Sequence, residues 1–220
     1  TKVIATTPCV LKLMEDSHIK LEDKVSKFLP ELTGDPNKFR ITIRHLLTHT
    51  SGLLPGIRKG YDWSGKSTGL ALACGEPSAG HAGYQHRYSD LNFILLGEIV
   101  SRVAGKPLSA FAKETIFDPL RMKETFFHPA ETYVPRIAPT TMMDDGSVLR
   151  GVVHDPTAGA MDGEAGHAGL FTTASDLARF ARMILRGGEL EWMPVSTPTV
   201  HGVWCICLRR SCSRTHSRNT

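Results

Sequence analysis

The 220-residue sequence lacks several features that mark common classes of protein. No apolar run approaches the ~18 residues of a membrane-spanning helix, and there is no internal repeat or coiled-coil pattern. The five cysteines contain neither a C-x-x-C pair nor a metal-site spacing, so they indicate no redox motif and no zinc site. The absence of G-x-S-x-G argues against an α/β-hydrolase. Convincing strand patterns are also few.

The charge is close to balanced except at the C-terminus. Hydrophobic residues make up 41% and charged residues 22%, which is ordinary for a globular protein with a buried core. The net charge of +4 comes from the end of the chain, where RRSCSRTHSRNT holds four arginines and no acid. We therefore predict no nucleic-acid-binding face. The chain starts without Met inside an expected helix, so the lack of a signal peptide says nothing about localisation.

Most of the recognisable patterns are helical. We expect a helix over residues 2–15 that Pro8 bends or interrupts, and further helices in LEDKVSKFLPEL, after Thr42, over 108–117 and after Thr173. Residues 53–86 are glycine-rich and residues 128–168 are rich in proline, so both are predicted to be long loops of the kind that line sites. Residues 169–173 have the pattern of a short strand.

The stretch RYSDLNFILLGEIVSRVAG, residues 87–105, joins a polar turn directly to an amphipathic helix. Phe93, Leu96 and Val100 recur at three- and four-residue steps, which predicts one buried face. Asp90 is a candidate N-cap, and Gly105 before Lys-Pro is a helix stop. The pattern fits either a capped surface helix or a reactive turn held still by a buried helix.

Three segments together resemble the serine beta-lactamase-like superfamily, in the branch of class C beta-lactamases, D-alanyl-D-alanine carboxypeptidases and family VIII esterases. The segments are TKVIATTPCVLKLME, ITIRHLLTHTSGL, and the long stretch from YSDLNFILLGEIV to IFDPLRMKET, supported by AGHAGLFTTASDLARFARMIL. The similarity covers roughly residues 1–199.

The first segment resembles the helix that carries S-x-x-K in this superfamily. The serine attacks a carbonyl, and the lysine one turn later helps to accept its proton. If Lys2 is that lysine, the serine belongs three residues earlier, before Thr1, and the sequence as given lacks the nucleophile. Ser17-His18-Ile19-Lys20 matches S-x-x-K literally but stands where the family has a turn, so we interpret it as coincidence. An N-terminal threonine nucleophile at Thr1 would require a different fold.

The second family motif, Y-x-N, here reads Tyr88-Ser89-Asp90. The resemblance makes Tyr88 the partner of Lys2 in proton transfer, because a neighbouring ammonium stabilises a phenolate. It makes Ser89 and Asp90 substrate-binding residues. A carboxylate cannot donate a hydrogen bond, so Asp90 is expected either to pair with Lys2 or to cap the helix. This departure puts beta-lactam hydrolysis in doubt more than acyl transfer in general. Asn92 stands two residues late and is expected to point elsewhere.

The third motif, K-T-G on an edge strand, is not found and is expected beyond residue 200. His167 in GHAG is predicted to be structural or to line the substrate site. His45 and His49 have an i, i+4 spacing that can bind metal, but without H-E-x-x-H they are predicted to be structural. The acids of the loop region are expected to be solvated: Asp144, Asp145, Asp155, Asp162 and Glu164.

The resemblance implies an α+β, beta-lactamase-like fold: an antiparallel sheet flanked by helices plus a helical subdomain, of which this chain holds mainly the helical part. We expect a partial domain over 1–199 and a non-family, out-of-frame or disordered tail over 200–220. The implied activity is serine hydrolysis of an ester, beta-lactam or D-Ala peptide through an acyl-enzyme, with little turnover in the chain as given. The alternatives are a non-catalytic peptidoglycan- or peptide-binding relative and an inactive, unstable fragment. No cofactor, metal or nucleic acid is expected, the protein is expected to be a monomer, and the resemblance implies a bacterial periplasmic or extracellular location.

Overall fold

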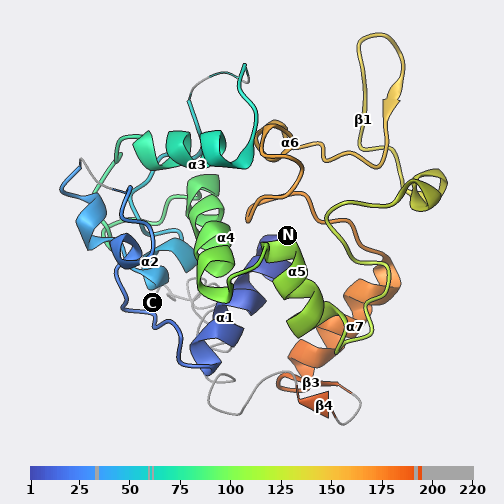
Figure 1. Ribbon diagram of the computed structural model, residues 1–220, viewed down its shortest axis with the longest axis horizontal. Coiled ribbons are helices and arrows are strands. Elements are labelled where there is room, and N and C mark those ends of the chain that lie inside the picture. The colour runs from blue at the N-terminus through green and yellow to red at the C-terminus, as the bar shows by residue number, and fades with distance from the viewer. Residues whose placement is uncertain (33–34, 59, 61, 191–192, 195–220) are drawn as a thin grey trace, which may run out of the picture.

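The computed structural model describes residues 1–32, 35–58, 60, 62–190 and 193–194. Helix α4 (Asp90–Ala104) runs through the centre and contacts α1 (Thr7–Glu15), α2 (Ile43–Leu47), α3 (Lys66–Gly75) and α5 (Leu108–Ala112) (Figure 1). The predicted tail 200–220 lies outside the described residues.

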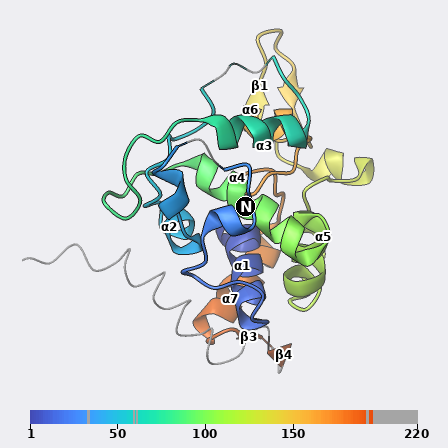
Figure 2. The ribbon, with the colours of Figure 1, turned by 60° about the vertical axis from the view of Figure 1, so that its left-hand side comes forward.

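The remaining elements are short or lie at the edge of the molecule. They are α6 (Pro156–Ala160), α7 (Ala174–Leu185), and two antiparallel two-stranded sheets, β1 (Thr141–Met142) with β2 (Val148–Leu149) and β3 (Glu189–Leu190) with β4 (Met193–Pro194). π-helical turns span Lys2–Thr6 and Lys113–Phe117, and 3-10 turns span Val25–Lys27, Lys38–Arg40 and Glu131–Arg136. The β1–β2 hairpin projects from the body on the side of α3 and α6, whereas α7 and the β3–β4 pair lie at the opposite end (Figure 2). No helix among the described residues is long and apolar enough to cross a membrane.

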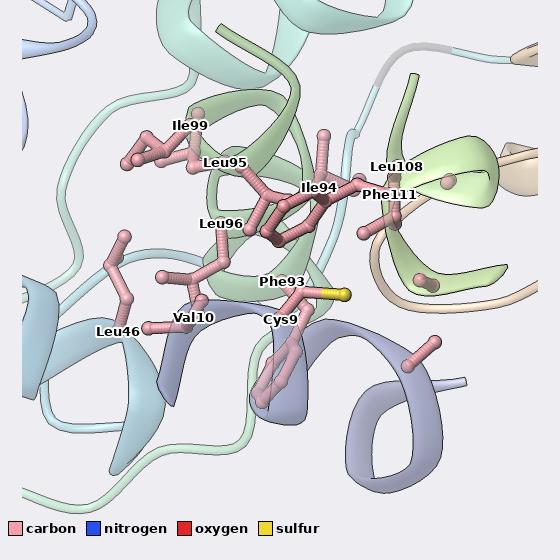
Figure 3. Packing of buried hydrophobic residues seen from close by; sticks show 14 of the residues in the cluster. Cys9, Val10, Leu46, Phe93, Ile94, Leu95, Leu96, Ile99, Leu108 and Phe111 are labelled. Carbon is pink, nitrogen blue, oxygen red and sulfur yellow. The ribbon is translucent and has the colours of Figure 1, made fainter. Parts of the chain in front are cut away.

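The core forms because α4 is apolar almost all round. Figure 3 shows Phe93, Ile94, Leu95, Leu96 and Ile99 of α4 packing between residues from its neighbours, and these five side chains are buried. The partners drawn there are Cys9 and Val10 of α1, Leu46 of α2, and Leu108 and Phe111 of α5. Full burial of each large side chain contributes about 1.5–3 kcal/mol. This burial fixes the position of the first turn of α4, where the polar turn of residues 88–90 begins.

Several predicted element ends are confirmed. Thr42 caps α2 through a capping box in which its hydroxyl accepts from the His45 amide and the His45 ring accepts from the Thr42 amide. Gly105 ends α4 with a positive φ of 66°. Thr173 caps α7 by accepting from the Asp176 amide. Pro8 stands where the π-helical turn changes to α1.

Three predictions of elements were wrong. Residues 169–173 form no strand, only an isolated bridge between Phe171 and Phe126. LEDKVSKFLPEL forms only the 3-10 turn Val25–Lys27, because its backbone pairs with the next segment: the amide of Val25 donates to Ile41, and that of Ile43 donates to Asp23. The loop predicted over 53–86 contains α3. Apart from Leu70, its buried residues are small (Gly69, Ala73 and Cys74), so it lacks the repeated large apolar side chains that signal a helix.

Candidate active site

Lys2 lies on the π-helical turn that leads into α1, and its ammonium group joins three parts of the chain. The Nζ atom is 2.8 Å from Asp90 Oδ1 and donates to the carbonyl of His167 at 3.1 Å. It also lies 5.2 Å from the centre of the Tyr88 ring. Burial lowers the pKa of Lys2, but hydrogen bonding to Asp90 and Tyr88 and the charge of Asp90 outweigh it, so the pKa lies above its usual value. The structure thus brings the predicted residues Lys2, Tyr88, Asp90 and His167 together.

Asp90 pairs with Lys2 and does not cap α4, which decides between the two expected roles. It is the first residue of the helix, and Ser89 stands at the N-cap position. A carboxylate in the first turn also interacts favourably with the helix dipole. Asn92 instead lies buried, where it bonds to Ser51 and His49, as the prediction that it points elsewhere requires.

The Tyr88 ring packs against the ring of His49. The two rings lie 4.7 Å apart between centroids at an interplanar angle of 33°, and Tyr88 itself is about half exposed. His49 follows α2 in a left-handed conformation, with φ of 55°. Its Nδ1 atom accepts from the Ser89 amide at 3.2 Å and lies 3.0 Å from the Asn92 side-chain nitrogen. The prediction that His49 is structural is confirmed, and its specific part is to support the turn that carries Tyr88.

The side chain of Ser89 points into the core, away from the position that the predicted substrate contact requires. Its side chain is completely buried, and its hydroxyl donates to the carbonyl of Leu54. Tyr88 and Asp90 face the site while the residue between them faces the core, because the extended backbone of Ser89 alternates the direction of successive side chains.

His167 is buried, with a side chain only 1% exposed, and pairs with a carboxylate that the sequence analysis left in solvent. Its Nε2 atom lies 2.9 Å from Asp155 Oδ1. Asp155 also caps α6 by accepting from the amide of Ala158 at 2.8 Å. Burial alone would raise the pKa of Asp155, but the hydrogen bonds from His167 and Ala158 hold it below its usual value. Asp155 is therefore an ionised part of the site.

Glu164 also corrects the expectation of solvated loop acids. It is buried, forms an ion pair with Lys66 at 2.9 Å and accepts from the amide of Ser109 at 3.2 Å. Burial raises its pKa, while the bonds from Ser109 and Lys66 lower it below the usual value. Glu164 thus ties the loop before His167 to α3 and α5.

Close backbone packing fixes the segment around His167 against α4. A Cβ atom on Gly97 would lie 2.8 Å from Gly166 Cα, and one on Gly166 would lie 1.9 Å from the carbonyl oxygen of Phe93. On the other side, the Thr6 hydroxyl donates to the Gly166 carbonyl at 2.6 Å. Only glycine at these two positions allows the loop to reach Lys2.

Oxygen and nitrogen atoms of Asp90, Asp155 and His167 lie within 4.8 Å of one another, a spacing that metal ions use. The ammonium of Lys2 already lies against Asp90, so a cation there would have to displace it. The arrangement is therefore better suited to hold a protonated lysine than a metal.

The literal S-x-x-K match at Ser17–Lys20 lies in an exposed turn after α1, so the interpretation as coincidence is confirmed. Ser17 and Lys20 are both exposed and do not share a helix face.

Comparisons with known proteins show the family and the fold of the chain. The family model described as Beta-lactamase matches residues 1–199. The N-acetylmuramyl-L-alanine amidase of Bacillus subtilis is 31% identical over an alignment that covers 86% of this chain and 49% of that protein. A solved structure of a beta-lactamase/D-alanine carboxypeptidase from Yersinia pestis is 26% identical, with a TM-score of 0.66, and the match covers 81% of this chain and 50% of that one. FmtA from Staphylococcus aureus, at 20% identity, shares the fold with a TM-score of 0.70 over 90% of this chain and 54% of its own.

The fold is that of the beta-lactamase-like and penicillin-binding-protein-like proteins, seen here mainly through its helical part. The chain belongs to the beta-lactamase family, whose members are hydrolases. It spans about half the length of the curated relatives it matches.

Proposed function

We propose that this chain is part of a serine hydrolase that works through an acyl-enzyme, with Lys2 and Tyr88 as its proton-transfer pair. The observation that carries the proposal is the ammonium of Lys2, fixed between Asp90 and the His167 carbonyl beside the ring of Tyr88. A lysine held by so many contacts has lost its rotamer freedom before any substrate arrives, as a catalytic group requires.

The proposed nucleophile is a serine three residues before Lys2, on the same helix face. Its oxygen forms a bond to the substrate carbonyl while its proton passes to the Lys2–Tyr88 pair. The pair then returns a proton to the leaving amine as the C–N bond breaks, and water repeats the sequence to release the acid. Within the described residues no serine side chain is a partner of Lys2. We therefore propose that the sequence as given has little or no turnover.

We propose an amide, in preference to an ester, as the substrate. The Bacillus subtilis relative is named as an amidase of N-acetylmuramyl-L-alanine, and the Yersinia pestis relative as a beta-lactamase and D-alanine carboxypeptidase. Both names describe cleavage of a C–N bond. Asp90, in place of the amide of Y-x-N, cannot donate to a substrate carbonyl, and this departure counts against beta-lactam hydrolysis more than against acyl transfer in general.

The test is covalent labelling of the protein produced with the residues that its gene encodes before Thr1. A fluorophosphonate probe should label one serine three residues before Lys2, and Lys2→Ala should abolish the labelling. A panel of muramyl-L-alanine peptide, D-Ala-D-Ala peptide, nitrocefin and a p-nitrophenyl ester then ranks the substrates. Absence of labelling in a folded protein would overturn the enzyme proposal in favour of a non-catalytic peptide binder. Turnover of the ester alone would overturn the choice of amide.

A further inference from the structure

Asp155 is the strongest unassigned feature beside the site. It follows His154 in the proline-rich loop region and starts α6, so from the sequence it was expected to be a solvated acid. In the structure its carboxylate caps α6 and bonds to the buried ring of His167. Its lowered pKa keeps it ionised at neutral pH.

The hydrogen bond to Asp155 sets the orientation of His167. A carboxylate only accepts, so the proton of this bond belongs to Nε2 of the imidazole. The ring is buried on both sides, and within the described chain Nδ1 has no hydrogen-bond partner. Asp155 is therefore the one described polar group that holds this ring in place.

The backbone of His167 passes this constraint on to Lys2. The carbonyl of His167 accepts from Lys2 Nζ at 3.1 Å, and the preceding Gly166 packs directly on the backbone of α4. A shift of the imidazole would move the carbonyl, because ring and carbonyl belong to one residue in a segment packed on both sides. The chain of contacts thus runs from Asp155 through His167 to Lys2.

Asp155 also adds charge near Lys2. One of its carboxylate oxygens lies within 4.8 Å of a carboxylate oxygen of Asp90, which in turn bonds to Lys2. The ammonium of Lys2 lowers the pKa of Asp155, and the interaction is mutual. The titratable groups that face Lys2 are the α-amino group of Thr1, Asp90 and Tyr88 at the start of α4, His49 after α2, and Asp155 and His167 on the α6 side.

We propose that Asp155 is a positioning residue for Lys2, which fixes its ammonium through His167 and supplies a second negative charge beside it. Asp90 bonds to the ammonium directly, and the carboxylate of Asp155 lies next to that of Asp90. The inference rests on the proposed role of Lys2 in proton transfer, but its test does not require turnover.

The test compares Asp155→Asn with the wild-type chain. Asparagine is as good an N-cap as aspartate, so α6 is preserved while the charge is removed. Asp145→Asn is the matched control, since Asp145 is an exposed acid of the β1–β2 hairpin. Trace acetic anhydride labelling between pH 8 and 11, read by mass spectrometry, measures the free-amine fraction of Lys2 at each pH. The exposed Lys20 serves as internal reference, and circular dichroism checks that each sample is folded.

Loss of a neighbouring charge should move the Lys2 labelling curve of Asp155→Asn to lower pH by roughly one unit, or about tenfold in reactivity at fixed pH. A change only in the access of acetic anhydride to Lys2 would multiply the labelling rate by the same factor at every pH and would not move the curve along the pH axis. A curve that coincides with those of wild type and Asp145→Asn would overturn the charge effect.

Two variants of His167 test the path through its ring. His167→Gln retains a side-chain N–H that can reach a carboxylate, whereas His167→Leu does not. The Leu variant should alter the labelling curve of Lys2, and the Gln variant should restore part of the wild-type behaviour. Equal behaviour of the two would overturn the role of the imidazole. If the Lys2 curve moves but the fluorophosphonate probe does not label the protein, this inference stands and the proposed enzyme activity is overturned. If the probe labels the protein but the Lys2 curve does not move, the enzyme proposal stands and this inference is overturned.

Discussion

The imidazole of His49 lies against the phenol ring of Tyr88, with the ring centroids 4.7 Å apart. The same imidazole accepts from the amide of Ser89, so one side chain fixes both the ring of the candidate catalytic tyrosine and the backbone that follows it. Burial, together with the neighbouring His86 ring and the ammonium of Lys2, lowers the pKa of His49 to about 4. The contact therefore depends on a histidine that stays uncharged.

Acid should remove the stability that this contact contributes. The pKa of His49 is lower in the folded protein than the ~6.5 of a free histidine, so below pH 6.5 the unfolded state binds the extra proton and is favoured. The contribution of His49 is complete above about pH 6.5 and is lost progressively as the pH falls towards 4. Thermal melts between pH 7 and 4.5 measure this loss of stability.

The variant for this prediction is His49→Asn. Asparagine tolerates the left-handed backbone at this position and offers an oxygen near the place of Nδ1, but it does not titrate. Its melting temperature should fall less between pH 7 and 4.5 than that of the wild type. The exposed His18→Asn is the control. Parallel pH profiles for wild type and His49→Asn would contradict the assignment.

Asp90→Asn should change the alkaline behaviour of the protein. Asp90 helps to raise the pKa of Lys2 above its unfolded value, so this contribution is present below about pH 10.5 and is lost as the pH rises through the folded pKa. Melts from pH 8 to 11 should show a smaller alkaline loss in Asp90→Asn than in the wild type. Both groups are partly exposed, so the difference at pH 8 should be below about 1 kcal/mol. A larger alkaline loss in the variant would contradict the sign of this coupling.

Gly97→Ala should destabilise the protein by about 1–3 kcal/mol, because the new methyl group meets backbone atoms of Gly166 that cannot move aside separately. Gly75→Ala at the end of α3 is the matched control, since its methyl group would meet no atom within 4 Å. Alanine there should be neutral or stabilising by up to about 1 kcal/mol. Urea unfolding of both variants measures the difference. Equal midpoints would show that α4 and the loop at Gly166 can move apart with little loss of stability.

Local sequence signals predicted α4, the Thr42 cap and the Gly105 stop because each depends on residues within one or two turns of each other. They failed at α3, whose buried face has one large apolar side chain, Leu70, among small ones. They also failed at Asp155, since its partner His167 comes from a separate loop and no periodicity links the two. One signal was available there: Asp155 before Pro156 has the pattern of an N-cap followed by proline at the first helical position. The approach of Lys2 to Asp90 was accessible only through resemblance to a family, because 87 residues of chain lie between them.

Tyr88→Phe gives the most direct test of the candidate site. Phenylalanine keeps the ring that stacks on His49 and the ring face near Lys2, and removes only the hydroxyl. Since Tyr88 is about half exposed, the melting temperature should change little. In the protein that includes the residues before Thr1, the fluorophosphonate labelling rate should fall by about 10²–10⁴-fold, the usual loss when a general acid–base group is removed. Tyr84→Phe is the control, because Tyr84 is 87% exposed and its ring lies against His81, not against His49. An unchanged labelling rate in Tyr88→Phe would remove the phenol from the mechanism and leave Lys2 as the sole base.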